Sequence, residues 1–86
     1  MSAEVSHASH AAIVNRLNRA GGHLRRVTVM IEEGRPCLDI AQQLQAVERA
    51  IVNAKRVLIH DHLDHCFSGE AGAVDLDEFR AIVRYL

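Results

Sequence analysis

The sequence has little of what β-sandwiches and membrane spans require. It contains no Trp, one Tyr and two Phe, and its one proline is Pro36. With many Leu, Ile, Val and Ala beside so few aromatic residues, helices are favoured over a β-sandwich. No stretch approaches the ~20 apolar residues of a membrane span, and the N-terminus has no basic segment followed by an apolar one. We therefore expect an all-α protein that stays in the cytoplasm.

Cysteine is also scarce, since only Cys37 and Cys66 are present. In a reducing compartment two cysteines fit metal ligands or reactive thiols better than a structural disulfide. A chain of 86 residues forms one small domain, here taken as residues 1–86, and small domains bury a smaller fraction of their surface than large ones. A metal ion or partner subunits are therefore expected to stabilise it.

Charge is unevenly distributed, although the net charge is only −1. No acidic residue lies between Ser6 and Ile31, whereas this segment holds four arginines: Arg16, Arg19, Arg25 and Arg26. The acidic residues gather later: Glu32, Glu33, Asp61, Asp64, Glu70, Asp75, Asp77 and Glu78. A basic first part set against an acidic last third permits a surface that binds DNA.

Two long helices are predicted by apolar residues at alternating spacings of four and three. The first helix, about residues 6–33, carries Ile13, Leu17, Ala20, Leu24, Val27 and Ile31. The second, about residues 36–66, carries Ile40, Leu44, Val47, Ile51, Ala54 and Leu58. Gly34 and Pro36 suit a tight turn between them, which makes an antiparallel hairpin.

A short third helix is predicted over about residues 76–86. Two glycines and no apolar period indicate a loop over residues 68–74, after which Asp75 can cap the helix. A hairpin whose helices are ~45 Å long exceeds what a small monomer needs, so a second hairpin should pack beside it. We expect two hairpins to form a four-helix-bundle dimer. Gly21 and Gly22, costly inside a helix, should serve close approach of a neighbouring helix or DNA.

The end of the second helix carries the residues with the clearest chemistry. His62 and Cys66 are four residues apart, which places them on one helix face within reach of one transition-metal ion. Cys37 lies ~37 Å from His62 on a continuous helix, so only an antiparallel partner helix brings the two together. The alternative is that the cysteines are small buried hydrophobic residues and the histidines favour the helix dipole. Spacing alone does not separate these alternatives.

Three segments resemble the family of copper-sensitive operon repressors and nickel/cobalt-responsive repressors. They are NRLNRAGGHL (15–24), PCLDIAQQLQAVERAI (36–51) and RVLIHDHLDHCF (56–67). The resemblance implies a helical hairpin with a short third helix that forms dimers and usually tetramers. It also implies a repressor whose DNA affinity falls on ligand binding. It also implies that Cys37, His62 and Cys66 are the metal ligands. Glu78 falls on the acidic position that supports the ligands in copper sensors.

The resemblance leaves the identity of the metal open. The tyrosine that precedes the first cysteine in copper sensors is Pro36 here, which weakens the case for Cu(I). Nickel and cobalt members add an N-terminal histidine, and His7 and His10 are available. Formaldehyde-sensing relatives instead use an N-terminal proline, where this chain has Ser2. The sequence therefore favours Ni(II) or Co(II), with Cu(I) as the alternative.

A row of basic residues is the candidate DNA surface. The row consists of Arg16, Arg19, His23 and Arg26. Their positions i, i+3, i+7 and i+10 place them on one face of the first helix. Such rows are usually solvated surfaces, but the resemblance makes this one a candidate phosphate-contacting stripe, with Arg16 at a family DNA-contact position. Arg49, Lys55 and Arg56 are expected to extend it on the second helix.

Among four classes of function, the sequence favours a ligand-gated repressor whose metal-free form binds operator DNA and whose metal-bound form releases it. Release would derepress a metal efflux or resistance operon. A metal-storage or chaperone protein without a DNA role is a weaker alternative, because it leaves the arginine row unexplained. A helical adapter would not need the three ligands. An enzyme is not expected, since neither cysteine has a clear base and a thin hairpin offers little pocket.

Overall fold

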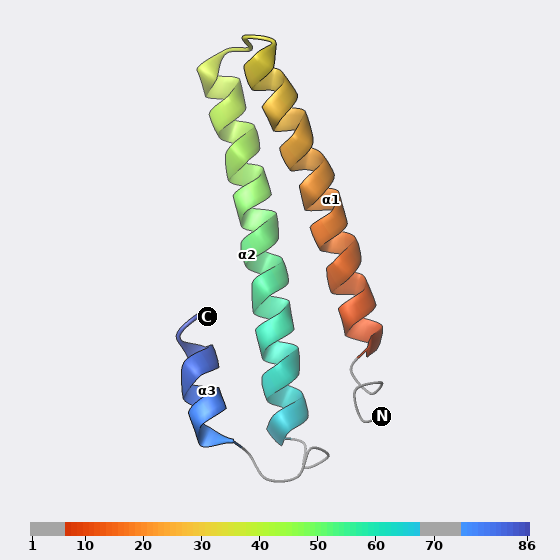
Figure 1. Cartoon of the computed structure of the whole chain (residues 1–86), viewed down its shortest axis with the longest axis vertical. Helices are drawn as coiled ribbons and strands as arrows, with labels where there is room; N and C mark the ends of the chain where they lie inside the picture. Colours follow the sequence, from red (N-terminus) through yellow and green to blue (C-terminus); the bar gives the residue numbers. More distant parts are fainter. Residues whose placement is uncertain (1–6, 68–74) are drawn as a thin grey trace.

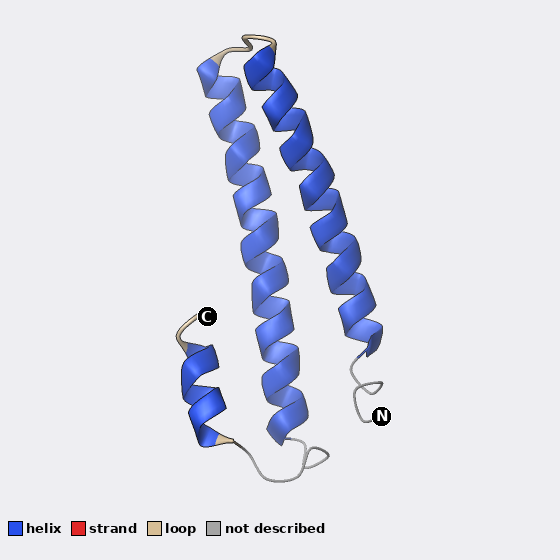
Figure 2. Cartoon of the chain, viewed as in Figure 1, coloured by secondary structure: helices blue, strands red, loops and turns tan. Residues whose placement is uncertain are grey.

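The computed structural model describes residues 7–67 and 75–86, with the side chains of residues 9–64 and 75–86. It contains the helices α1 (His7–Glu32), α2 (Cys37–Phe67) and α3 (Leu76–Val83), and no strand within these ranges. In Figures 1 and 2, α1 and α2 run antiparallel, and α3 lies beside the C-terminal part of α2, on the side away from α1. The predicted all-α hairpin with a short third helix is confirmed.

The hairpin turn ends α1 with a Schellman motif. Gly34 has φ +72°, the left-handed region that favours glycine. Its backbone N–H donates to Ile31 O (3.1 Å), and the N–H of Arg35 donates to Met30 O (3.0 Å). The carbonyl of Pro36 accepts from Ile40 N (3.1 Å), so α2 begins at Cys37, one residue later than predicted. The predicted turn at Gly34 and Pro36 is confirmed.

Helix α3 begins as predicted and ends earlier. The Asp75 carboxylate accepts hydrogen bonds from Asp77 N (3.0 Å) and Glu78 N (3.2 Å), which is an N-cap. The helix was expected to reach Leu86 but ends at Val83. After it, Tyr85 N donates to Ile82 O and Leu86 N to Val83 O, tighter i to i+3 bonds that commonly close a last helical turn. The predicted loop at residues 68–74 lies outside the described residues.

In each long helix, the predicted apolar stripe separates into residues that are buried between α1 and α2 and residues that are exposed. The sequence did not indicate this separation. In α1, Ile13, Ala20 and Val27 recur every seven residues and are buried against α2. In α2, Val47, Ala54 and Ile59 are buried. Ile40 is half-buried. The other members of both stripes are exposed, and we call them the uncovered stripe: Leu17, Leu24 and Ile31 in α1, and Leu44, Ile51 and Leu58 in α2. One hairpin therefore leaves half of the residues in its two apolar stripes exposed.

The dimensions of the chain are those of an extended hairpin and not of a compact domain. The chain measures 54 × 24 × 13 Å, so its thinnest dimension is close to the diameter of one helix. Its radius of gyration is 17.1 Å, against about 12 Å for a compact domain of this length. Its accessible surface is 6427 Å², against about 5000 Å² for a globular monomer of this mass. None of the helices in the described part of the chain has the length and hydrophobicity of a membrane span.

The glycine pair of α1 does not serve close approach between the two helices of this chain. A Cβ atom added to Gly21 would meet only the Arg25 guanidinium, at 3.9 Å. One added to Gly22 would meet only the side-chain ends of Arg25 and Arg26, at 3.8 and 4.0 Å. No atom of α2 lies within contact distance of either position. Close approach of α2 is therefore excluded, while close approach of a helix from another chain or of DNA stays a prediction.

Candidate metal centre and nucleic-acid interface

Cys37 and His62 lie at opposite ends of α2. Cys37 is its first residue and is exposed, whereas His62 is half-buried near the last turn. The helix is continuous between them, so they are ~37 Å apart at 1.5 Å per residue. Among the described side chains, no three His, Cys, Asp or Glu residues are close enough to hold one metal ion. A site that uses both Cys37 and His62 therefore requires a second chain.

The positions of these residues along α2 relate them to the uncovered stripe. Cys37 precedes Leu44 by seven residues, so it continues the spacing of Leu44, Ile51 and Leu58. His62 follows Leu58 by four residues, which places it on the same side of the helix. Cys66 follows His62 by another four, although its side chain lies outside the described residues. The candidate ligands thus occupy both ends of the apolar face that this chain leaves uncovered.

Helix α3 places a carboxylate against the imidazole of His62. Glu78 Oε1 lies 3.3 Å from His62 Nε2, and both side chains are about half exposed. The N-cap at Asp75 holds the start of α3, including the backbone N–H of Glu78. A carboxylate is an acceptor, so the proton of a neutral His62 sits on Nε2. In this tautomer Nδ1 carries the lone pair that can bind a metal ion, and Glu78 fixes the orientation of the ring.

The N-terminal part of α1 reaches this end of the molecule. His10 and His62 line one cavity of about 290 Å³, together with Leu58, Ile59 and Ile82. His10 Nε2 also lies 4.0 Å from Asp61 Oδ2, which is an ion-pair distance but too long for a hydrogen bond. The side chain of the other candidate, His7, lies outside the described residues. The roles of His7 and His10 as ligands stay predictions.

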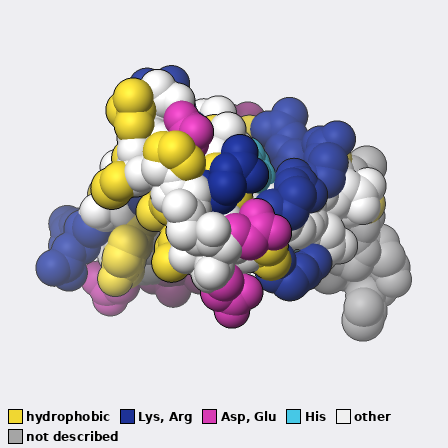
Figure 3. Space-filling view, turned by 90° about the horizontal axis from the view of Figure 1, so that it is seen from above, with side chains coloured by type: hydrophobic (Ala, Val, Ile, Leu, Met, Phe, Trp, Pro, Cys, Tyr) yellow, Lys and Arg dark blue, Asp and Glu magenta, His cyan; other side chains and the backbone are white. Residues whose placement is uncertain are grey.

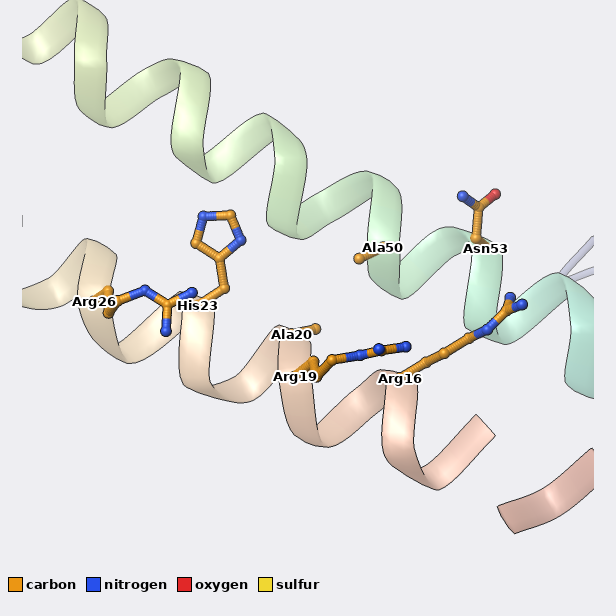
Figure 4. A pocket seen from close by; sticks show the side chains of 7 residues that line it. All are labelled: Arg16, Arg19, Ala20, His23, Arg26, Ala50 and Asn53. Carbon is orange, nitrogen blue, oxygen red and sulfur yellow. The ribbon is translucent and has the colours of Figure 1, made fainter. Parts of the chain in front are cut away.

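The predicted basic row forms one side of a groove between α1 and α2. The groove has a volume of about 490 Å³ and is lined by Arg16, Arg19, Ala20, His23, Arg26, Ala50 and Asn53. Figure 4 shows the arginine and histidine side chains extending from α1, and Ala50 and Asn53 on the neighbouring α2. In Figure 3, Lys and Arg side chains gather on the α1 side of the hairpin. We call this the arginine groove, and it fits an anion.

His23 connects the two walls of the arginine groove. Its Nε2 lies 2.6 Å from Gln43 Oε1 of α2, a short hydrogen bond in which the amide oxygen is the acceptor. The proton of a neutral His23 is therefore on Nε2. Figure 4 shows the other ring nitrogen, Nδ1, on the side of Ala20 and Ala50. His23 thus presents Nδ1 to the groove.

The expected extension of the basic row onto α2 holds in part. Arg49 and Arg56 line a second groove of about 340 Å³, which shares Asn53 with the arginine groove and also contains Glu48. Lys55 follows Asn53 by two residues, or about 200° around the helix. It is exposed but lines neither groove, so the structure does not bring Lys55 to this surface.

Sequence reasoning missed Asn53, Gln43 and Asp61. Asn53 joins the two grooves, Gln43 orients His23, and Asp61 lies beside His10. None of them interrupts the apolar spacing, so each read as an ordinary solvated residue. One available signal for Asn53 was its place three residues after the small Ala50, which puts both on one face of the helix.

Comparisons with known proteins agree on one family. The sequence model of the family described as metal-sensitive transcriptional repressor matches residues 9–85. The copper-sensing transcriptional repressor CsoR of Mycobacterium ulcerans (strain Agy99) is 37% identical over 89 residues, covering 99% of this chain and 75% of the relative. CsoR of Mycobacterium tuberculosis (strain ATCC 25618 / H37Rv) is 40% identical over 68 residues, covering 79% and 56%.

A third relative comes from a Bacillus species. CsoR of Bacillus subtilis (strain 168) is 43% identical over 54 residues, which are 63% of this chain and 54% of the relative. The chain therefore spans three quarters of the Mycobacterium ulcerans protein but little more than half the length of the other two. No solved structure matches the chain significantly.

Proposed function

The chain belongs to the metal-sensitive transcriptional repressor family, and from that premise we propose that it represses transcription by binding operator DNA until Cu(I) binds. In this proposal the arginine groove contacts the DNA backbone. The metal site consists of Cys37 from one chain with His62 and Cys66 from another. Metal binding lowers the affinity for DNA and so derepresses a copper efflux or resistance operon.

The observation that carries the proposal is the position of Cys37 in the register of the uncovered stripe. A second α2, packed antiparallel along Leu44, Ile51 and Leu58, covers these side chains and places its Cys37 beside His62. The same packing joins two hairpins into a four-helix bundle. The dimer is thus expected to exist before metal binds, because the apolar face has to be covered with or without an ion.

Copper is the metal that this donor set and the relatives favour together. Two thiolates and one imidazole suit a soft ion such as Cu(I). The three relatives are named as copper-sensing repressors, which supports Cu(I) over the nickel or cobalt preference predicted from Pro36 and the N-terminal histidines. The contact between Glu78 and His62 supplies a supporting carboxylate even though Pro36 replaces the tyrosine.

Nickel or cobalt is kept as the second candidate because His10 lines the same cavity as His62. Ni(II) prefers four or more ligands and would need such an additional donor. The variant His10→Ala separates the metals, since it weakens a nickel response and leaves a copper response unchanged.

The proposal is tested by measuring DNA affinity and metal response together. The probe is a fluorescein-labelled duplex from immediately upstream of the gene that encodes the chain, followed by anisotropy under anaerobic conditions. We expect binding by the metal-free protein and release on addition of Cu(I). Cys37→Ala should bind the duplex as tightly as the wild type and no longer release it, because Cys37 is exposed and far from the arginine groove.

Two results would contradict the proposal. Metal-free protein that does not bind the duplex removes the DNA role and favours a storage or chaperone function. Full copper-driven release by Cys37→Ala removes Cys37 from the metal site.

The salt dependence of DNA binding supplies a further check. Each phosphate contact adds about one unit to the slope of log affinity against log salt concentration, so Arg16→Glu should reduce that slope.

A further inference from the structure

We propose that His23 is a proton-dependent phosphate ligand in the arginine groove, so that the protein binds DNA more tightly as the pH falls. The inference rests on the proposed function, because it takes the DNA backbone as the anion that enters the groove. It adds a second input, proton concentration, to a repressor that otherwise responds to metal.

The hydrogen bond to Gln43 determines which atom of His23 meets the phosphate. An amide oxygen only accepts, so Nε2 carries a proton in the neutral and in the charged ring. Nδ1, on the side of Ala20 and Ala50, therefore holds a lone pair when His23 is neutral. A lone pair repels a phosphate oxygen. Protonation turns Nδ1 into a charged donor, and hydrogen bonds to ionised partners are about twice as strong as neutral ones.

The charged groups around His23 permit a phosphate to bind beside Nδ1. On α1 the groove contains Arg16, Arg19 and Arg26, and on α2 the facing residues Gln43, Ala50 and Asn53 are uncharged. A cavity on the other side of His23 adds Glu33 and Arg35. These two form an ion pair with each other, Arg35 Nη1 being 4.0 Å from Glu33 Oε1. The groove itself thus has no carboxylate among its lining residues to compete with a phosphate.

The sign of the pH dependence follows from linkage. A phosphate seated among the arginines places negative charge beside Nδ1 and favours the protonated ring in the complex. The complex then holds more protons than the free protein, so affinity rises as the pH falls. The effect is sought between about pH 8 and pH 6, the range in which histidine is the side chain that ordinarily changes its charge. If the phosphate strengthens proton binding about tenfold, each His23 contributes about fivefold in affinity over this range.

The experiment compares the wild type with His23→Gln and His23→Arg, metal-free and at constant ionic strength, on the same labelled duplex from pH 6 to pH 8. Gln keeps a polar side chain that cannot be protonated, and Arg carries a permanent charge. We expect His23→Gln to lose about fivefold of the rise in affinity per engaged groove. His23→Arg should bind tightly throughout and lack the same rise. His60→Gln, which removes an exposed imidazole that does not line the groove, should behave as the wild type.

Proton uptake gives an independent readout. Binding heats measured at pH 7 in two buffers of different ionisation enthalpy report the protons taken up per chain, and this number should fall in both His23 variants. Wild-type pH dependence and proton uptake in His23→Gln would overturn the inference while leaving the DNA role intact. If His23→Gln does not fold, the response of His23→Arg decides in the same way. A wild type that does not bind the duplex at any pH would overturn both the inference and the proposed function.

Discussion

Glu78 is the residue through which the short third helix acts on the candidate metal site. Its carboxylate lies 3.3 Å from His62 Nε2. Glu78→Gln should weaken Cu(I) binding by about 10- to 100-fold, as is usual when a group supporting a metal-bound histidine is lost. DNA affinity of the metal-free protein should not change. Competition with a chromophoric Cu(I) chelator measures the metal affinity.

The matched control for Glu78 is Asp77→Asn. It removes one negative charge from the same helical turn without touching the contact to His62. Equal losses of copper affinity in the two variants would mean that the site responds to charge in general. The orientation of the His62 ring by Glu78 would then not be the cause.

The candidate site residues differ in how far the sequence could predict them. His62 and Cys66 stand four residues apart on a helix, and the distance from Cys37 to His62 requires a second chain, so spacing alone raises the idea of a shared site. Glu78 could not be found from spacing, because residues 68–74 separate α2 from α3 and the sequence does not indicate their path. Only the family resemblance pointed to it. The roles of Gln43 and Asn53 depend on which face of α2 packs against α1. Residue spacing does not determine that face.

At the scale of the helix, the glycine pair is a stability cost that packing within the chain does not explain. Since an added Cβ at Gly21 meets only the end of a flexible arginine, Gly21→Ala should raise the free energy of unfolding by about 1 kcal/mol. For a domain of this size that corresponds to a rise in Tm of about 4–8 °C. Thermal unfolding followed by circular dichroism at fixed protein concentration measures it.

DNA affinity of Gly21→Ala then tests why glycine is present. A more stable variant that binds the duplex less tightly would point to close approach of the DNA backbone at α1. Unchanged DNA affinity would remove that second use as well. A lower Tm would mean that a neighbouring chain, absent from the single hairpin, packs against Gly21.

The elements themselves could be predicted almost completely. The bounds of α1 and α2 agree with the sequence prediction to within one residue at each end, because Gly34 and Pro36 are strong stop and start signals. The division of the apolar stripe could not be predicted. Leu17 and Ala20 are both apolar and three residues apart, so hydrophobicity does not say which of them faces α2. The small side chains Ala20 and Ala54 face the other long helix, and the larger Leu17 and Ile51 remain uncovered.

At the scale of the whole molecule, the uncovered stripe makes the single hairpin an incomplete unit. Its six side chains are each about half exposed. Covering the remaining half contributes about 1 kcal/mol for each side chain, before the cost of association is subtracted. This face also carries Cys37 and His62 at its two ends, so assembly and formation of the metal site depend on the same surface.

Ile51→Asp tests this dependence, because Ile51 lies at the middle of the stripe in α2 and is 45% exposed in the single chain. A carboxylate there stays hydrated in a lone hairpin but would be buried without a partner charge in a four-helix bundle. Light scattering after size exclusion should give a multiple of the 9.5 kDa chain mass for the metal-free wild type and about one chain mass for the variant. Tight Cu(I) binding should be lost with the dimer, since Cys37 then has no partner.

The control is Gln42→Asp, an exposed position nine residues earlier and about half a turn around α2 from Ile51. It adds the same side chain and should leave both mass and copper affinity unchanged. A monomeric wild type, or an Ile51→Asp variant that binds copper tightly as a monomer, would place the metal site within one chain and contradict the intersubunit arrangement.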